Sequence, residues 1–149
     1  MKKIVLLFVG LLLLACEDTE FNNPAFEGLL NQEFWDATET FAIANTDGSI
    51  TINATRSSEI VALRFPGNAG DYELGFIAEA VAQYAEGNAP VFSTTNSNGA
   101  GQISVEQVTT EFVTGTFSFL AVQSGTEAEV FMQQGTFFQI PIIDLSETQ

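Results

Sequence analysis

The sequence predicts an all-β domain, either an antiparallel β-sandwich or a partly open barrel of about ten strands. From Ala25 onward, apolar and polar residues alternate with the period of two that is typical of half-buried strands. Short segments rich in Gly, Ser, Asp and Asn separate the alternating runs, at spacings typical of all-β folds. At 149 residues and 46% hydrophobic content, the chain is long enough to bury the core of one domain without a disulfide.

The N-terminal segment has the pattern of a signal peptide. Lys2 and Lys3 precede an apolar run at residues 4–14, which at eleven residues is too short to span a bilayer as a helix. The following Leu-Leu-Ala-Cys at 13–16 resembles the lipobox of bacterial lipoproteins, which implies cleavage before Cys16 and acylation of its thiol. An ordinary secretory signal that contains a Cys is the alternative.

Acidic residues follow the predicted lipidation site directly. Glu-Asp-Thr-Glu at 17–20 and Phe-Asn-Asn-Pro at 21–24 indicate a short solvated tether. The acidic stretch resembles the export signal of surface-displayed lipoproteins of Bacteroidota, which implies attachment to the outer membrane with outward display. The expected organisation is therefore a signal peptide at 1–15, an acylated Cys and tether at 16–24, and a single β-rich domain at 25–149.

Net charge restricts the partners. Once the signal peptide is removed, all 19 acids remain against two cations, Arg56 and Arg64. Such a field repels phosphate backbones and anionic lipid, so nucleic-acid binding is excluded and membrane contact is expected only through the lipid on Cys16. Solubility of an exported protein explains the acidity, and a dedicated cation-binding role is the alternative.

Two turns in the first half of the domain predict a three-strand antiparallel meander. A two-residue loop at residues 47–48 would place Ile43 opposite Ile52, and a turn at residues 57–58 would place Ile52 opposite Leu63. Both registers bring apolar side chains to one face, which is expected to face the core. The other face, half-solvated, is expected to carry Ala42, Ala44, Thr51, Asn53 and Arg64.

The second half of the domain continues in the same pattern. Alternating runs begin at Ile103, Val113, Ala128 and Thr136, and turn signals lie at residues 99–101, 124–126 and 134–135. The segment Ala78 to Ala85 fits both a helical stripe and a strand alternation. Its surroundings favour a strand, and a short helix is the alternative.

Several motifs of turn glycines and core aromatic residues are spread over the mature chain: Phe34-Trp35, residues 45–52 (NTDGSITI) and 70–75 (GDYELG), and residues 115–119 (GTFSF) and 135–137 (GTF). With these motifs the chain resembles an uncharacterised family of small β-rich lipoproteins of Bacteroidota, in which a lipobox precedes one domain of unknown function. The resemblance implies the fold and the anchor, and it carries over no functional residue. In this chain, an Ala-rich segment at 78–85 replaces the usual aromatic-rich segment before the middle hairpin.

The residue inventory leaves few routes to catalysis. The sequence has no His and one Cys, so no Cys/His zinc site, Cys-ligated cluster or internal disulfide can form. Asp47 belongs to a turn signal, and no spaced acidic calcium loop surrounds it. Glu127 and Glu129 are a possible carboxylate pair, but acids at this spacing more simply mark the solvent side of an edge strand. We expect no catalytic residue, no metal and no cofactor.

Three aromatic residues, Trp35, Tyr72 and Tyr84, are the weak candidates for ligand binding, as a platform for sugar rings. Capping of the core is the alternative role for them. The function expected from the sequence is a membrane-anchored, non-catalytic β-domain that binds an unidentified protein or glycan, or that contributes to envelope structure. The alternatives are a carrier of apolar ligands, which the 14 Phe would permit, and a glycan hydrolase that works with carboxylates alone.

Overall fold

The structure is a computed structural model that describes residues 24–144. The predicted signal peptide, Cys16 and nearly all of the predicted tether lie outside these residues. Within them the chain has no helix, so none that spans a membrane, and the expected all-β fold is confirmed. Eleven strands form one mixed, mostly antiparallel sheet: β1 (Ala25–Leu30), β2 (Glu33–Asp36), β3 (Glu39–Ala44), β4 (Ser49–Arg56), β5 (Glu59–Pro66), β6 (Gly70–Gly75), β7 (Val81–Glu86), β8 (Phe92–Ser93), β9 (Ala100–Val108), β10 (Phe112–Gln123) and β11 (Glu129–Ile143).

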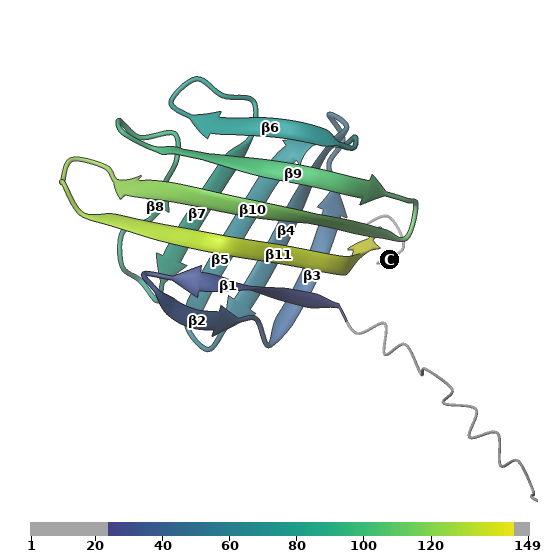
Figure 1. Ribbon diagram of the computed structural model, residues 1–149, viewed down its shortest axis with the longest axis horizontal. Coiled ribbons are helices and arrows are strands. Elements are labelled where there is room, and N and C mark those ends of the chain that lie inside the picture. Colours follow the sequence, from purple (N-terminus) through teal and green to yellow (C-terminus); the bar gives the residue numbers. More distant parts are fainter. Residues whose placement is uncertain (1–23, 145–149) are drawn as a thin grey trace, which may run out of the picture.

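The strands are arranged in two layers that cross at a steep angle (Figure 1). The front layer has the order β6-β9-β10-β11-β1-β2, and the back layer contains β3, β4, β5 and β7. Two short connections join the layers: β8 pairs with β7 and β10, and the end of β11 pairs in parallel with β3. Each connection to the front layer involves two Cα pairs, so the sheet is a partly closed ring, intermediate between a sandwich and a barrel.

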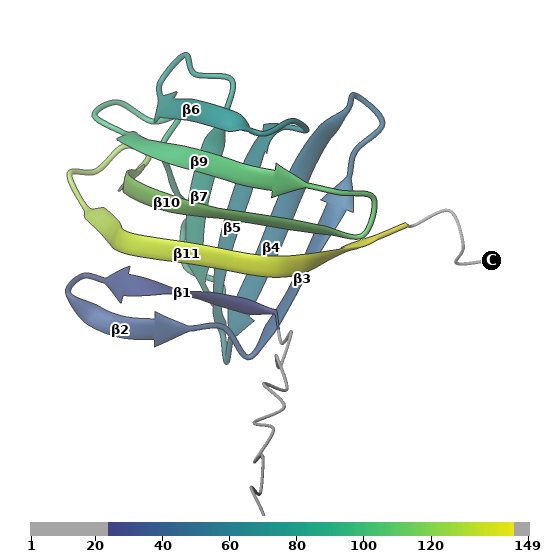
Figure 2. The same cartoon turned by 45° about the vertical axis from the view of Figure 1, so that its right-hand side comes forward.

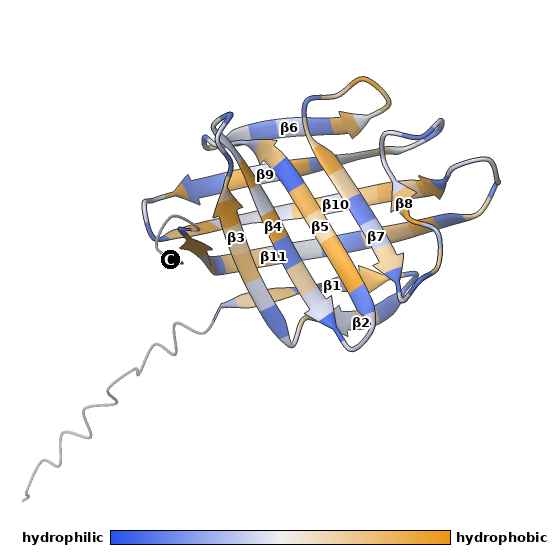
Figure 3. Cartoon of the chain, turned by 180° about the vertical axis from the view of Figure 1, so that it is seen from behind, coloured by the Kyte–Doolittle hydropathy of each residue, from blue (hydrophilic) through white to orange (hydrophobic). Residues whose placement is uncertain are grey.

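The β4–β5 register is the one that the turn at residues 57–58 predicts. Ile52 lies opposite Leu63, and both side chains are fully buried. Buried residues alternate with less buried ones along most of β4, β5 and β7, the strands that face the viewer in the view from behind (Figure 3). This alternation buries one face of each strand against the front layer.

The β3–β4 register differs from the prediction by one residue. The expected pairing of Ile43 with Ile52 is wrong: Ala42 lies opposite Ile52 and is fully buried, whereas Ile43 is half-buried on the other face. The cause is the loop length. The amide of Asn45 donates to the carbonyl of Ser49 at 2.8 Å, so three residues form the loop rather than two. Its last residue, Gly48, takes a φ of 87°, as expected of a glycine that ends a three-residue hairpin loop.

A predicted turn at residues 134–135 is instead a β-bulge within the continuous strand β11. Gly135 pairs with Phe117 and Met132 with Phe119, so β11 has one extra residue between these pairs. Gln134 occupies the bulge with a φ of 51°. The bulge allows a 15-residue strand to follow the twist of the front layer while keeping its apolar residues inward.

The segment with both helical and strand patterns forms a strand where it packs. Val81–Glu86 is β7 and pairs with β5, so the favoured expectation of a strand is confirmed there. Ala82 and Tyr84 are buried, and the residues between them face outward. Tertiary pairing on both sides therefore overrides the helix propensity of the alanines.

Phenylalanine rings fill the space between the layers. The ring of Phe117 lies 4.8 Å from that of Phe26 and 6.2 Å from that of Phe137, and Phe137 is 6.3 Å from Phe65. A Cβ at Gly135 would lie 2.6 Å from the Phe117 ring, so the rings also use space that a glycine leaves open. These phenylalanines pack on one another rather than lining a cavity.

Candidate functional site

The three aromatic residues considered as a sugar platform do not form one. Trp35 is fully buried, and Tyr84 is 7% exposed. Tyr72 is half-buried, stacks on Phe65 at 6.2 Å, and donates its hydroxyl hydrogen to the carbonyl of Asn68. Because their ring faces are used within the fold, Trp35 and Tyr84 cannot stack on a ligand. They cap the core, the alternative that the sequence left open.

Trp35 and Tyr84 belong to a charged cluster at the β4–β5 turn. The hydroxyl of Tyr84 donates to Glu59 Oε1 at 2.8 Å, and Arg56 Nε donates to Glu59 Oε2 at 2.9 Å. The Arg56 guanidinium also lies 5.3 Å from the Trp35 ring centroid. Burial opposes ionisation of Glu59, but the hydrogen bonds from Arg56 and Tyr84 outweigh it and lower its pKa. Burial, followed by the bond to Glu59, raises the pKa of Tyr84.

The second arginine is also paired with a carboxylate. Arg64 forms an ion pair with Asp47, whose carboxylate also accepts hydrogen bonds from the amide and hydroxyl of Ser49. The bonds from Ser49, and then Arg64, lower the pKa of Asp47. The hydrogen bonds of the turn and this ion pair thus explain why an Asp occupies position 47 without a metal ion. Within residues 24–144, no three Asp, Glu, His or Cys side chains are grouped closely enough to hold a metal.

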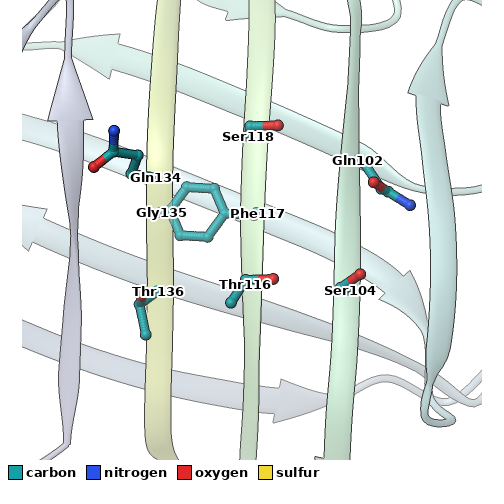
Figure 4. A pocket seen from close by; sticks show the side chains of 8 residues that line it. All are labelled: Gln102, Ser104, Thr116, Phe117, Ser118, Gln134, Gly135 and Thr136. Atoms are coloured by element: carbon teal, nitrogen blue, oxygen red, sulfur yellow. The ribbon is translucent and has the colours of Figure 1, made fainter.

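The outer face of the front layer contains a polar hollow of about 500 Å³, which is open to solvent (Figure 4). Short side chains from three adjacent strands form its floor. Two cross-strand rows are visible in the close view, and each contains one residue from β9, one from β10 and one from β11. The rows are Ser104, Thr116 and Thr136, and Gln102, Ser118 and Gln134.

The row of hydroxyl groups extends across all six strands of the front layer. Ser104 lies opposite Asp71 of β6, and Thr136 lies opposite Glu27 of β1. Glu27 in turn lies opposite Asp36 of β2. We call this set the polar row: Asp71, Ser104, Thr116, Thr136, Glu27 and Asp36. With strands about 4.8 Å apart, the row is about 24 Å long.

The middle of the polar row is neutral and its ends are acidic. Ser104 donates a hydrogen bond to Asp71. Within the described part of the chain, no hydrogen bond joins the side chains of Thr116, Ser118 or Thr136 to another residue, so these hydroxyls can bond to a ligand or to water. Both arginines of residues 24–144 come from the back layer. The polar row itself therefore offers donors and acceptors without a positive charge, and Arg56 meets this layer at its β2 edge, where Nη1 donates to the carbonyl of Phe34.

Apolar side chains border this polar strip. Phe138 is 40% exposed and follows Thr136 by two residues on the same face of β11. Phe34 of β2 is 62% exposed and lies opposite Leu29, which is half-buried. The outer face thus combines hydrogen-bonding groups with apolar rings at its margins.

Glu127 and Glu129 do not form the facing pair that hydrolysis requires. Both are exposed, and both come from one segment at the start of β11, where they line a hollow of about 590 Å³ among the loops. This hollow and the polar hollow both open to solvent, and phenylalanine rings occupy the interior between the layers.

A family model described as a domain of unknown function (DUF6252) matches residues 22–141. The chain belongs to this family. The match covers all of the two-layer fold except the last residues of β11, and it confirms the expectation of a domain-of-unknown-function family. No curated protein matches the chain, and no solved structure does either.

Proposed function

We propose that this DUF6252 domain is a non-catalytic binding module of a Bacteroidota lipoprotein, and that it binds a neutral glycan chain on the outer face of the front layer. The polar hollow carries the proposal. Six of the eight residues that line it carry hydroxyl or amide side chains, which donate and accept hydrogen bonds as a sugar hydroxyl does, and Phe117 and Gly135 complete the lining. Its open shape, and a row about 24 Å long, suit an extended chain rather than an enclosed small molecule.

Charge selects the class of glycan. The polar row has carboxylates at both ends and no cation along it, so an anionic polysaccharide would meet repulsion without compensation. A neutral chain meets the unpaired hydroxyls of Thr116, Ser118 and Thr136 at the centre. Phe138 and Phe34 at the margins offer apolar faces to the C–H faces of sugar rings.

The N-terminal segment supports the cellular location that we propose, which is the outer membrane. Cys16 carries the lipid and is the only membrane attachment, and the acidic tether directs display on the outside of the outer membrane. Export as an anchored module would place the outer face in contact with polysaccharide of the surroundings. The acids of the domain then keep it soluble and away from anionic lipid.

The two alternative functions have less support. A hydrolase that uses only carboxylates needs one acid with a raised pKa facing a second acid across the substrate. Asp47 and Glu59, two carboxyl groups of residues 24–144 whose pKa values depart clearly from normal, are both shifted downward and held by arginines. A carrier needs an enclosed apolar cavity, and packed rings such as Phe117 occupy that position.

Binding to a panel of soluble polysaccharides tests the proposal. The panel contains neutral, anionic and cationic chains, and isothermal titration calorimetry measures the affinity of the purified full-length protein. We expect a neutral chain to bind and anionic chains to fail. Thr116→Tyr and Ser118→Tyr should each weaken binding by about tenfold or more, because a ring would fill the hollow.

Thr55→Tyr is the matched control, since Thr55 is a half-buried residue of β4 in the back layer. It should leave affinity unchanged. If no neutral polysaccharide binds, or if Thr55→Tyr reduces affinity as much as Thr116→Tyr does, the outer face is not the site.

A further inference from the structure

A second surface lies at the loop between β6 and β7, where two large apolar residues stand next to each other in solvent. Phe76 is 71% exposed and Ile77 is 91% exposed. The base of the loop is fixed: the amide of Ala78 donates to the carbonyl of Gly75 at 3.3 Å, and Leu74 and Ala80 form a parallel bridge. Leu74 and Ala80 are both buried, so the core holds the two ends of the loop and leaves the apolar pair outside.

Two open hollows border this pair, and both are acidic. A hollow of about 590 Å³ lies between Phe76 and the loops at 95–98 and 122–129, and it includes Glu127 and Glu129. A hollow of about 470 Å³ is lined by residues 71–80, which include Asp71, Glu73 and Glu79. No Lys or Arg lines either hollow. We call Phe76, Ile77 and these five acids the tip surface.

We propose that the tip surface binds a segment of a partner protein that carries both apolar and basic side chains. Apolar side chains of the segment would cover Phe76 and Ile77, which otherwise remain in water. Lys or Arg side chains would meet carboxylates on both sides, and a guanidinium can also stack on the Phe76 ring.

Charge excludes two other occupants of this surface. A second copy of the chain would bring its own acids, without a Lys or Arg on its tip surface to compensate them. An anionic membrane would be repelled by the same carboxylates. A partner with positive charge is the occupant that the surface complements.

The position of the tip surface suits a partner in the surroundings. The β6–β7 loop lies at the opposite end of the molecule from the start of β1, where the chain enters the domain, and two views agree on this (Figures 1 and 2). With an anchor on the N-terminal side, the tip would point away from the membrane. This inference stands apart from the glycan proposal, because Phe76, Ile77 and four of the five acids lie outside the polar row, with which the tip surface shares Asp71, and because the ligand chemistry differs.

A labelled synthetic peptide of alternating Leu and Arg tests the inference by fluorescence anisotropy with the full-length protein. A Leu and Gln peptide and phosphatidylcholine vesicles are the comparison probes. We expect the Leu and Arg peptide to bind, and the double variant Phe76→Ser with Ile77→Ser to weaken that binding by about tenfold or more. Glu127→Gln with Glu129→Gln should weaken it as well and reduce its dependence on salt.

Ile60→Ser is the matched control, because Ile60 is also an exposed apolar residue, at 43%, but lies in β5 of the back layer. It should leave peptide binding unchanged, and the thermal unfolding midpoint of the double variant should match that of the parent protein. Absence of peptide binding, or an equal loss in Ile60→Ser, would overturn the inference. Equally tight binding of the Leu and Gln peptide would also overturn it, and vesicle binding that requires Phe76 would assign the tip to a neutral membrane instead.

Discussion

Ile52→Ala tests the register on which the core of the back layer depends. Ile52 is fully buried in β4, between Ala42 of β3 and Leu63 of β5. The substitution removes three side-chain carbons, which at about 0.8 kcal/mol each corresponds to about 2.4 kcal/mol of lost transfer free energy. Its neighbour Ala42 is small and cannot fill the space, so a cavity term adds to this. We expect the free energy of unfolding to fall by about 3 to 4 kcal/mol.

Urea denaturation followed by tryptophan fluorescence measures this loss, with the slope of the transition unchanged. Ile43→Ala is the matched control, because it removes the same three carbons from a half-buried residue on the opposite face of β3. It should cost about 1 kcal/mol, and Asn53→Ala should cost less still. Equal losses for Ile43→Ala and Ile52→Ala would refute the observed register and restore the pairing of these two residues in the core.

Three further predictions concern packing, pH and the anchor. Gly135→Ala should lower the free energy of unfolding by about 1 to 3 kcal/mol, because its Cβ would lie 2.6 Å from the Phe117 ring, whereas Gly75→Ala, with no atom closer than 3.7 Å, should be nearly neutral in the same urea assay. The pKa of Glu59 is lowered in the folded state, so its ionised form stabilises the fold above the unfolded-state value near 4.5, and this contribution disappears as the pH falls through the folded-state pKa. The difference in urea midpoint between the parent protein and Glu59→Gln should therefore narrow between pH 7 and pH 3, and a constant difference would contradict the assignment. Cys16→Ser should abolish acylation and membrane retention, and mass spectrometry that finds an unmodified thiol at Cys16 in membrane-extracted parent protein would count against the anchor.

Local turn chemistry predicted part of the back layer correctly. The turn at residues 57–58 placed Ile52 opposite Leu63, because a two-residue connection sets the register in which Ile52, Val61 and Leu63 share the buried face. The predicted two-residue loop at residues 47–48 was wrong, because the Asp-Gly dipeptide occurs in both two-residue and three-residue hairpin loops. The additional loop residue shifted β3 by one position, which moved Ala42 rather than Ile43 into the core.

Pairings between distant segments were beyond local patterns. The parallel contact of Ile142 with Ala42 joins residues about a hundred positions apart, and no turn signal marks it. Similarly, Gln134 and Gly135 resemble a turn in sequence, but they form a bulge because β1 and β10 pair with β11 on both sides. The approximate number of strands and the faces of β4 and β5 could be predicted, whereas the face of β3 was wrong and the closure of the ring required long-range contacts.

The candidate sites were missed for the same reason. The alternation of apolar and polar residues places Ser104, Thr116 and Ser118 on the solvent side of their strands. It does not indicate which strands are neighbours, so the cross-strand row could not be predicted. The sequence offers Trp35 as part of a sugar platform because Trp combines an apolar ring face with a polar edge. Its position between two exposed residues, Phe34 and Asp36, is the alternation that buries it.

The acids of the front layer have a structural consequence that links its two proposed surfaces. The sheet ends at β2 and β6, and both end strands carry acids, including Asp36 and Asp71, that disfavour pairing with another chain. The same placement leaves neutral hydroxyls at the middle of the polar row and gathers carboxylates at the tip surface. Binding of a neutral glycan to the row should therefore change little with salt, whereas binding of a basic segment beside Phe76 should weaken as salt screens the acids. Titrations of both ligands at low and high salt would distinguish the two surfaces. The affinity of the basic segment should fall as salt screens the carboxylates, whereas the affinity of the neutral glycan should stay nearly constant.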